Sequence, residues 1–431
     1  MLTPPTTPLP RIQNSLAAQL PAEILSAIFV KVVQPEVADW LDVINRRRVV
    51  VFVCRHWRAV AAGLAILWTR IHIAPPVLPY FLQECIRKAG PSADVFVDLN
   101  PHPFRTIYDN GSLRDVKSLS SEDFMTRSVE LLRAIFPRVR SLAVNDGHHS
   151  EMYAVMGLLA GFRADGLESL RVAASQYSTA VDPPMPAGMH LKDLTLKGVR
   201  SLWTSPALYA GLTKLTLDDL RELEWLELWA VLDGNNALLE LHLWDVSCVG
   251  WSNANRATVP NVSLFAVKYR TNADKSFLAS VVLPELIHLD VELEGHAAIL
   301  GVAEDMGALL GSAQNIRLAG WGFREDELGS VVAVCTNARV LNLRRCRPFP
   351  APALLRLAAA PHFSLPKLKL LKVSGDLNEE GALKLVSSPF PSGLVISEWV
   401  VSADRDSEFK EWELVEGKLR MRSVEDTIDG R

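Results

Sequence analysis

The sequence predicts an α/β chain in which a small helical domain is followed by a βα solenoid with parallel strands on its concave face. Two observations predict this architecture. An apolar stripe of helical period lies near the N-terminus, and a six-residue apolar pattern recurs ten times between residues 139 and 373. A chain of 431 residues also exceeds what one ordinary hydrophobic core supports, so two domains or a repeat array are expected.

The recurring pattern is apolar-x-x-apolar-x-apolar, and its period is that of leucine-rich repeats. Its copies are 21 to 30 residues apart and start at Val139, Leu167, Leu191, Leu212, Leu238, Val262, Leu286, Ala313, Ala338 and Leu368. Helices are expected between copies, at residues 154–162, 223–232, 297–310, 325–334 and 353–359. A strand that returns through a helix to a parallel strand forms a right-handed coil, so the repeats should stack into a curved solenoid.

The turn after each six-residue copy departs from the regular repeat. Regular repeats place Asn or Cys three residues after the last apolar position, where the side chain satisfies backbone groups of the turn. Cys346 fits that pattern, whereas other copies hold Val199, Leu220, Val246 and Trp321. The sequence therefore predicts that apolar packing replaces most of this row of polar turn side chains, which we call the polar ladder.

These patterns divide the chain into five segments. They are a disordered tail rich in Pro and Thr (1–15), the helical domain (16–73), a linker and N-terminal cap of the solenoid (74–135), the solenoid (136–393), and a C-terminal cap with a charged tail (394–431). A helix at 78–88 and a strand at 94–99 are expected to open the solenoid. Strands at 394–401 and 411–415 are expected to close it, and the polar stretch 101–123 is the expected mobile insertion.

The helical domain begins with Leu20-Pro21, since proline suits the start of a helix. Apolar residues then recur at i, i+1, i+4 and i+5, as Ile24, Leu25, Ile28 and Phe29. A second helix is expected to carry Val53, Trp57 and Val60 on one face. So small a domain cannot bury all of this apolar surface by itself, and part of it should meet a partner or the next domain.

Three ordered segments, Leu20-Pro21-Ala22-Glu23-Ile24-Leu25, Val53-Cys54-Arg55-His56-Trp57-Arg58 and Leu67-Trp68, together resemble the F-box. The resemblance covers residues 20–73 and departs from the family at 34–51, which is longer than the compact family pattern. With the repeats, the chain resembles the degenerate leucine-rich F-box proteins of mushroom-forming fungi. The resemblance implies an adaptor that docks on a Skp-family protein, and through it on a cullin, while other subunits transfer ubiquitin.

The motif match assigns this docking to a set of mostly apolar residues, some of which must instead hold the small domain together. They are Leu20, Pro21, Ile24, Leu25, Ile28, Phe29, Val53, Cys54, Trp57, Leu67 and Trp68.

The strand face of the solenoid is the expected site for an unknown protein target. Residues between the apolar positions of each copy alternate outward and form a ladder of mixed charges, which suits recognition of a polypeptide. The predicted target-binding residues are Arg171, Asp193, Lys214, Glu240, His242, His288, Asp290, Arg317, Asn342 and Lys372, together with Trp244 as a candidate hot spot. Trp225 and Trp229 are expected in the core.

Composition argues against several other classes. A net charge of -4 gives no electrostatic case for nucleic acid, and no stretch reaches the ~20 apolar residues that cross a bilayer. Five scattered cysteines without a Cys-x-x-Cys pair indicate reduced thiols in the cytoplasm or the nucleus. The adjacent pair His148 and His149 lacks further ligands, so a surface turn is favoured over a metal site. We expect no cofactor, and a monomer within a hetero-complex.

No catalytic motif occurs in the sequence, and Cys54 is expected to be an inert thiol on an apolar helix face. A non-catalytic subunit is therefore expected. Two alternatives remain open: a scaffold that uses the F-box without promoting ubiquitination, and a solenoid enzyme or ligand-binding protein with a pocket on the concave face.

Overall fold

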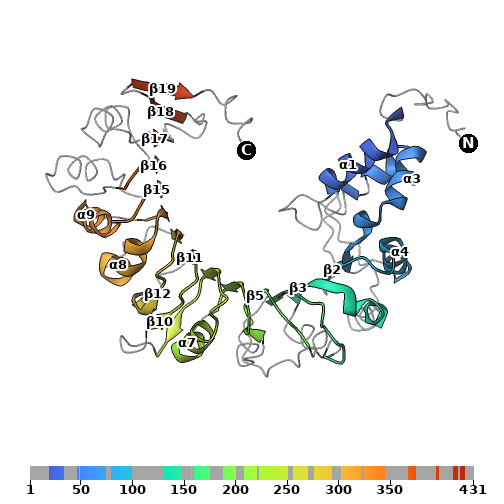
Figure 1. The fold of residues 1–431 in the computed structure, drawn as a ribbon, viewed down its shortest axis with the longest axis horizontal. Coiled ribbons are helices and arrows are strands. Elements are labelled where there is room, and N and C mark those ends of the chain that lie inside the picture. Colours follow the sequence, from blue (N-terminus) through green and yellow to red (C-terminus); the bar gives the residue numbers. More distant parts are fainter. Residues whose placement is uncertain are drawn as a thin grey trace, which may run out of the picture. The chain divides into compact units, whose positions relative to one another are not determined.

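The computed structural model forms two compact units, which are Met1–Ser175 with Pro183–His190, and Gln176–Asp182 with Leu191–Arg431 (Figure 1). The structure describes residues 19–33, 46–47, 49–73, 79–99, 130–147, 157, 160–174, 188–199, 208–220, 223–250, 256–269, 276–293, 302–321, 325–344, 367–374, 395–397, 411–415 and 418–422. The expected tail 1–15, the insertion 101–123, the helix 353–359, residues 154–156 and 158–159 of the expected helix 154–162, and His148, His149 and Cys346 lie outside this part of the chain.

The helices of the first unit are α1 (Ala22–Val33), α3 (Arg55–Gly63), the 3-10 helix η2 (Ala65–Trp68) and α4 (Pro79–Ala89). Helix α1 packs on α3 and η2, and the Phe29 and Trp57 rings meet with centroids 5.1 Å apart. The second helix was expected to include Val53, but it does not. A helical stretch at 49–52 ends before Val53, and α3 begins at Arg55 because Cys54 caps it.

The strands of the first unit are β1 (Arg70–Ile73), β2 (Val95–Leu99), β3 (Val139–Gly147) and β4 (Ser169–Ala174), paired in parallel in this order. Strand β1 lies inside the range 16–73 expected for the helical domain, yet it joins the sheet. Its alternating burial, with Ile71 and Ile73 inside, is the period-2 signal of a strand. The helical segment therefore runs directly into the sheet.

The second unit contains one long sheet that follows the chain order. Its parallel strands are β5 (Asp193–Lys197), β6 (Lys214–Asp218), β8 (Glu240–Trp244), β11 (Leu264–Tyr269), β13 (His288–Leu293), β14 (Asn315–Ala319), β15 (Val340–Arg344), β16 (Leu370–Ser374) and β17 (Val395–Ser397). Each six-residue copy of the sequence coincides with one strand of β3 to β16, which confirms the predicted repeat. Short parallel pairs join β7 (Leu223–Glu224) to β9 (Cys248–Val249) and β10 (Ala257–Thr258) to β12 (Val281–Val282).

The closing strands are antiparallel. Strand β18 (Glu411–Val415) pairs with β17, as predicted, and β19 (Lys418–Arg422) then pairs with β18, which the sequence did not predict.

Helices α7 (Trp225–Asp233), α8 (Val302–Ser312) and α9 (Glu325–Val334) lie on the same side of this sheet (Figure 1). The 3-10 helix η6 (Ser276–Ser280) contacts α8. Helix α9 has the predicted bounds, and α7 starts two residues later than expected. Helix α8 covers the described part of its expected range, 302–310, and ends two residues later than expected, while residues 297–301 lie outside the described part of the chain. The described helices leave the opposite face of the sheet uncovered, and we call that face the ladder face.

A repeated turn follows four of the strands. Gly198, Asp219, Asp245 and Gly320 have φ values of 62°, 54°, 52° and 72°. Each donates its N–H to a carbonyl on the next strand, with N···O distances of 2.6 to 2.9 Å. The turn sends the following side chain inward, and these side chains, Val199, Leu220, Val246 and Trp321, are all buried. The predicted replacement of the polar ladder by apolar packing is thus confirmed at all four positions.

Candidate functional site

The structure divides the predicted docking residues into two groups. Four are core residues with at most 5% of their surface exposed: Leu25, Phe29, Leu67 and Trp68. The other seven reach the surface in part or fully: Leu20, Pro21, Ile24, Ile28, Val53, Cys54 and Trp57. The buried group has no surface to offer a partner, so docking stays a prediction for the exposed group only.

Trp68 illustrates why the buried group belongs to the core. Its indole N–H donates to the Ala61 carbonyl at 3.0 Å, which ties η2 to α3. The Lys88 ammonium lies 4.0 Å from the ring centroid and the Arg47 guanidinium 5.4 Å from it, within cation–π range. Arg47 also donates to the Arg70 carbonyl at 2.8 Å, and burial lowers the pKa of its guanidinium. This cluster therefore joins the helical segment to β1.

The sequence predicted that Cys54 lies on an apolar helix face, but the structure places it before the helix. It is the N-cap residue of α3, where its sulfur accepts a hydrogen bond from the Trp57 N–H at 3.4 Å. The nearby His56 Nε2 lies 3.0 Å from the Leu20 carbonyl oxygen. The His56 contact joins the start of α3 to the residue before Pro21 and α1. The Cys54 sulfur satisfies an N–H that the start of α3 leaves without an intrahelical partner.

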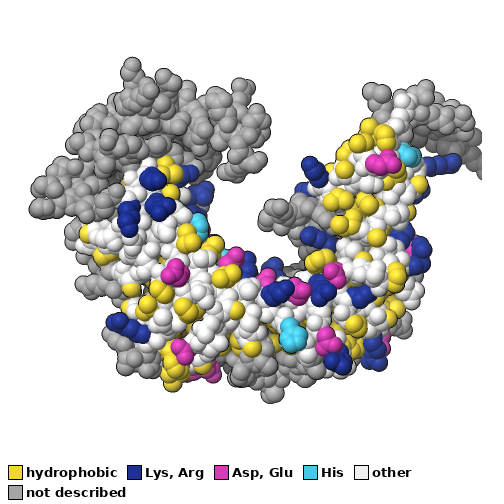
Figure 2. All heavy atoms as spheres, viewed as in Figure 1, with side chains coloured by type: hydrophobic (Ala, Val, Ile, Leu, Met, Phe, Trp, Pro, Cys, Tyr) yellow, Lys and Arg dark blue, Asp and Glu magenta, His cyan; other side chains and the backbone are white. Residues whose placement is uncertain are grey.

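Exposed apolar side chains gather on the helical segment, where Figure 2 shows them over the α1 region. Helix α1 contributes Ile24 and Ile28, and the stretch before α3 contributes Val49, Phe52 and Val53. The exposed fraction is 50% for Ile24, 69% for Phe52 and 48% for Val53. We call these five residues the N-terminal apolar patch. The motif match selected neither Val49, which falls in the stretch 34–51 that departs from the family pattern, nor Phe52, which directly follows that stretch.

On the ladder face of the second unit, strand register aligns the outward side chains in three rows. The first row carries the predicted Asp193, Lys214, Glu240 and His288, and the central row carries His242, Asp290, Arg317, Asn342 and Lys372. The third row carries Trp244, together with five charged residues that the sequence analysis missed, Lys197, Asp218, Lys268, Glu292 and Arg344. All of the predicted residues in this unit therefore lie on one face.

The predicted Arg171 lies in the first unit, on β4, and is exposed. The same sheet holds a polar group at its outward positions. His72 Nδ1 lies 3.1 Å from Asp98 Oδ2, and the Asn145 amide donates to Asp98 Oδ1 at 2.6 Å. These three residues could not be predicted as a group, because nothing in the sequence of a single strand indicates which strand will lie beside it.

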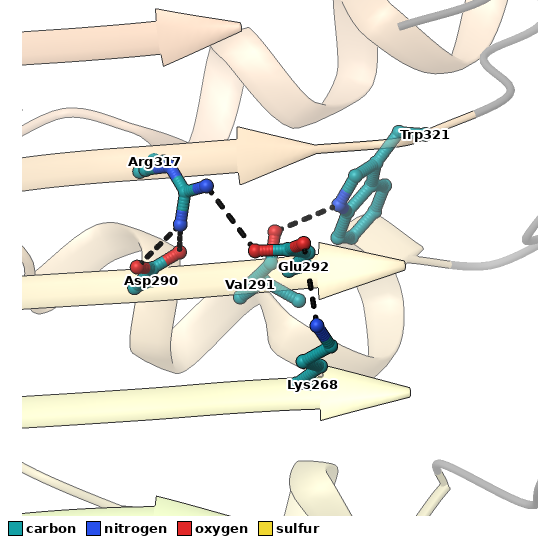
Figure 3. Close-up of polar contacts among 6 residues, drawn as sticks. All are labelled: Lys268, Asp290, Val291, Glu292, Arg317 and Trp321. Carbon is teal, nitrogen blue, oxygen red and sulfur yellow. Dashed lines mark hydrogen bonds and ion pairs between the residues drawn. The ribbon is translucent and has the colours of Figure 1, made fainter. Parts of the chain in front are cut away.

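Ion pairs connect neighbouring strands of the ladder face. Arg317 on β14 donates to both carboxylate oxygens of Asp290 on β13, at 2.7 and 2.6 Å, and to Glu292 at 3.2 Å (Figure 3). Lys268 on β11 lies 3.6 Å from the other oxygen of Glu292. Burial alone would lower the pKa of Arg317, but the hydrogen bonds and charges of the two carboxylates outweigh it and raise the pKa. These charges therefore largely compensate one another.

A second cluster lies on β6 and β8. Lys214 Nζ is 3.0 Å from Glu240, and this hydrogen bond lowers the pKa of the Glu240 carboxyl. His242 Nε2 lies 3.5 Å from Glu240, yet burial lowers the pKa of His242. The Trp244 ring meets the His242 ring edge-on with centroids 5.9 Å apart and is 38% exposed. The neighbours of Trp244 in the third row belong to ion pairs, Lys197 with Asp218 and Lys268 with Glu292.

The arrangement suits binding better than bond making. Within the described ranges, no three His, Cys, Asp or Glu side chains gather as a metal site would require. Cys335 is buried, and burial raises the pKa of its thiol to about 12, so its nucleophilic thiolate form is suppressed. None of the helices in the described part of the chain is long and apolar enough to span a membrane.

Trp225 is buried as expected, whereas Trp229 is half-exposed and donates to the Arg256 carbonyl at 3.2 Å.

Comparison with known proteins gives one family match. Residues 17–74 match the F-box-like family, so the chain carries an F-box-like domain there. Among solved structures, the chain is similar to the leucine-rich repeat-containing protein LegL7 from Legionella pneumophila, with 13% identity over 76% of this chain and 89% of that one. The TM-score of that superposition is 0.34, which is too low to support an assignment. Among curated proteins, none matches the sequence.

Proposed function

We propose that this protein is the target-recognition adaptor of a cullin-RING ubiquitin ligase. The F-box-like domain would dock on a Skp-family adaptor, and the ladder face would hold the protein to be modified. The observation that carries the proposal is the F-box-like domain at 17–74 together with the exposed apolar side chains on it. The proposed role is non-catalytic.

The N-terminal apolar patch supports the docking half. Ile24, Phe52 and Val53 each leave about half or more of their surface in water, although the same small unit buries Leu25 and Phe29 completely. Burying one such side chain against a partner contributes about 1.5–3 kcal/mol, so a few of them suffice for a stable complex. The mixture of buried and exposed positions is what an F-box needs, because one group holds the domain together and the other docks.

The ladder face supports the target half. Parallel strands present a continuous surface on which side chains point away from the core in register, and solenoids use such surfaces to bind partners. Trp244 supplies a partly exposed indole between ion-paired neighbours, and tryptophan is one of the residues most enriched in interface hot spots. Charged side chains at the edge of an interface, as these ion pairs would be, contribute more to the choice of partner than to affinity.

The proposed mechanism is one of proximity. Holding a target lysine close to a charged ubiquitin-conjugating enzyme replaces a bimolecular encounter with an effectively intramolecular one, and raises the local concentration of the two reactants. This chain need not activate a nucleophile. We propose the cytoplasm or the nucleus as its location, and a single copy within the hetero-complex.

Copurification from the source cells tests the proposal. A tagged chain should bring down a Skp-family protein and a cullin, and a crosslinked target should accumulate when docking is abolished. The comparison should use the double variant Ile24→Asp/Phe52→Asp rather than deletion of 17–74, because deletion would also remove β1 and expose the edge of β2.

Recovery of the Skp-family protein without a cullin, with no protein accumulating in the double variant, would contradict the ligase role. That result would favour the scaffold alternative, in which the chain binds partners without promoting their modification.

A further inference from the structure

We infer that the target protein is held on the ladder face by one uncharged apolar side chain, aromatic or aliphatic, which packs against Trp244 over Ala266. This inference rests on the target half of the proposed function, whose ligand chemistry it names, and is independent of F-box docking. Ala266 on β11 is then a residue that determines which targets bind. None of the target-binding residues predicted from the sequence lies on β11, so Ala266 adds to that set.

Ala266 forms a low point of the ladder face. Strand register places it in the central row, between His242 on β8 and Asp290 on β13. These two neighbours have longer side chains and lie two strand spacings, or about 10 Å, apart. Ala266 is half-exposed between them. A side chain of a partner has room here, because the β11 position of this row holds only a methyl group.

An uncharged wall borders this low point. Trp244 on β8 lies diagonally across from Ala266 and is 38% exposed. Its ring meets the His242 ring edge-on, with centroids 5.9 Å apart. Burial lowers the pKa of His242, so this ring is uncharged at neutral pH. Leu264, which is half-exposed, occupies the first row of the same strand as Ala266. These side chains together offer a partner a largely apolar surface.

The carboxylates beside Ala266 are engaged by strands on the far side from β11. Glu240 on β8 lies 3.0 Å from Lys214 Nζ on β6. Asp290 on β13 accepts two hydrogen bonds from Arg317 on β14, at 2.7 and 2.6 Å (Figure 3). Each ion pair holds its carboxylate toward the neighbouring strand, and therefore away from the space over Ala266.

Two further polar neighbours follow the same rule. Lys268 on β11 extends toward Glu292 on β13, with Nζ and the carboxylate oxygen 3.6 Å apart (Figure 3). The Asn315 amide nitrogen on β14 lies 3.3 Å from His288 Nδ1 on β13. Lys268 therefore leans away from Trp244 on β8, and His288 leans away from β11. The ion pairs and hydrogen bonds of the ladder face thus leave an uncharged space at its centre.

Charge decides between the possible occupants of this space. A carboxylate over Ala266 would face the carboxylates of Glu240 and Asp290. A cation over the Trp244 ring would lie beside Lys268, which pairs with Trp244 in register. Like charges side by side oppose binding, whereas an apolar side chain meets no such repulsion and removes exposed indole surface from water. The electrostatic arrangement therefore favours an uncharged apolar group.

NMR of the full chain labelled with nitrogen-15 at tryptophan tests the inference. The chain has 11 tryptophans, and the indole signal that is missing from Trp244→Phe identifies Trp244. The probes are the amides of N-acetyl-phenylalanine, N-acetyl-leucine, N-acetyl-lysine and N-acetyl-glutamate, which share one uncharged backbone. We expect the phenylalanine and leucine compounds to shift the Trp244 signal with a Kd on the order of 10 mM. The lysine and glutamate compounds should bind about tenfold more weakly or not at all.

Substitution of Ala266 localises the site. Ala266→Glu should weaken binding of the phenylalanine compound by about tenfold or more, because a long side chain then fills the low point. Ala266→Gln, which adds length without charge, should weaken it as well. The matched control is Asn342→Glu, which changes the net charge equally in the central row of β15, three strands away, and should bind as the wild type does. Circular dichroism shows that each variant is folded.

The crosslinked target gives a second readout. Ala266→Glu should lose the target while a Skp-family protein still copurifies, and Asn342→Glu should keep both. If the wild type crosslinks no target, the target half of the proposed function fails, and the amide titration still decides whether the space over Ala266 accepts apolar groups.

An equal shift of the Trp244 signal by the lysine or the glutamate compound would overturn the inference. Unchanged affinity in a folded Ala266→Glu variant, or an equal loss in Asn342→Glu, would also overturn it. Shifts of other indole signals without that of Trp244 would place the apolar site elsewhere on the chain.

Discussion

Trp68 donates its indole N–H to the carbonyl oxygen of Ala61 at 3.0 Å, and both residues are buried. The family motif contains this tryptophan, so sequence alone placed it among the docking residues. The contact shows instead that it holds η2 against α3. Some residues of the motif therefore hold the domain together, and docking stays a prediction for the exposed ones.

Replacing Trp68 should destabilise the first unit. We expect Trp68→Ala to lower the free energy of unfolding by about 3–5 kcal/mol, because it removes a large buried ring. Trp68→Phe should cost about 1–3 kcal/mol, since it removes the indole hydrogen bond and part of a buried ring, while the Ala61 carbonyl keeps the Leu64 N–H at 3.3 Å. Urea unfolding followed by circular dichroism measures both. Ile66→Ala, on an exposed side chain of the same 3-10 helix, is the control and should stay within about 0.5 kcal/mol of the wild type.

Leu241 and Leu239 lie two residues apart, Leu241 within β8 and Leu239 just before it. Leu241 is fully buried, whereas Leu239 is 46% exposed. Leu241→Ala should cost about 2–5 kcal/mol through lost burial and a cavity between repeats. Leu239→Ala should cost little. Equal losses in thermal unfolding would show that the six-residue pattern does not define the core.

Two glycines should respond to alanine with opposite signs. Gly320 has φ 72°, and a Cβ there would lie 1.9 Å from the Leu293 carbonyl oxygen. Gly320→Ala should therefore cost more than the ~1–3 kcal/mol of a strained backbone alone. Gly307 lies within α8 with nothing within 4 Å of its added Cβ, so Gly307→Ala should stabilise by up to ~1 kcal/mol. A stabilising Gly320→Ala would refute the turn geometry.

Stability should depend on the protonation of His242. Burial lowers its pKa below the ordinary 6.5, so the unfolded chain takes up the proton more readily than the folded one. The contribution of neutral His242 to the free energy of unfolding is thus fully present above pH 6.5. It is lost as the pH falls from 6.5 through the lowered pKa of the folded protein. His242→Gln should remove this part of the acid loss, as measured by unfolding temperatures of both proteins across that range. An unchanged pH profile would contradict the assignment.

Sequence patterns predicted the strands best, because the buried period-2 positions of each repeat are fixed by the hydrophobic effect. Helix α9 was predicted to the residue, yet α7 starts two residues late, since helix ends depend on capping and packing. Strand β1 was missed because its two isoleucines follow directly on the family motif. Likewise, no pattern separates Leu25 from Ile24: adjacent residues of one apolar stripe differ in burial only once α1 has packed.

On the ladder face, the sequence predicted which residues point outward but not which are paired. Arg317 and Asp290 lie 27 positions apart, and only the register of β13 with β14 brings them into contact. The third row was largely missed because the repeat motif ends before it. Its Asp218 and Glu292 compensate the charges of Lys197 and Lys268 on the neighbouring strands.

The affinity of the purified chain for a Skp-family adaptor tests the central claim most directly. By isothermal titration calorimetry the wild type should bind. Ile24→Asp/Phe52→Asp should weaken binding at least about a hundredfold while its circular dichroism and unfolding temperature stay close to those of the wild type. The matched control Leu226→Asp, at a 56% exposed leucine of α7, should bind as the wild type does. Absence of wild-type binding, or equal binding by the folded double variant, would contradict the account.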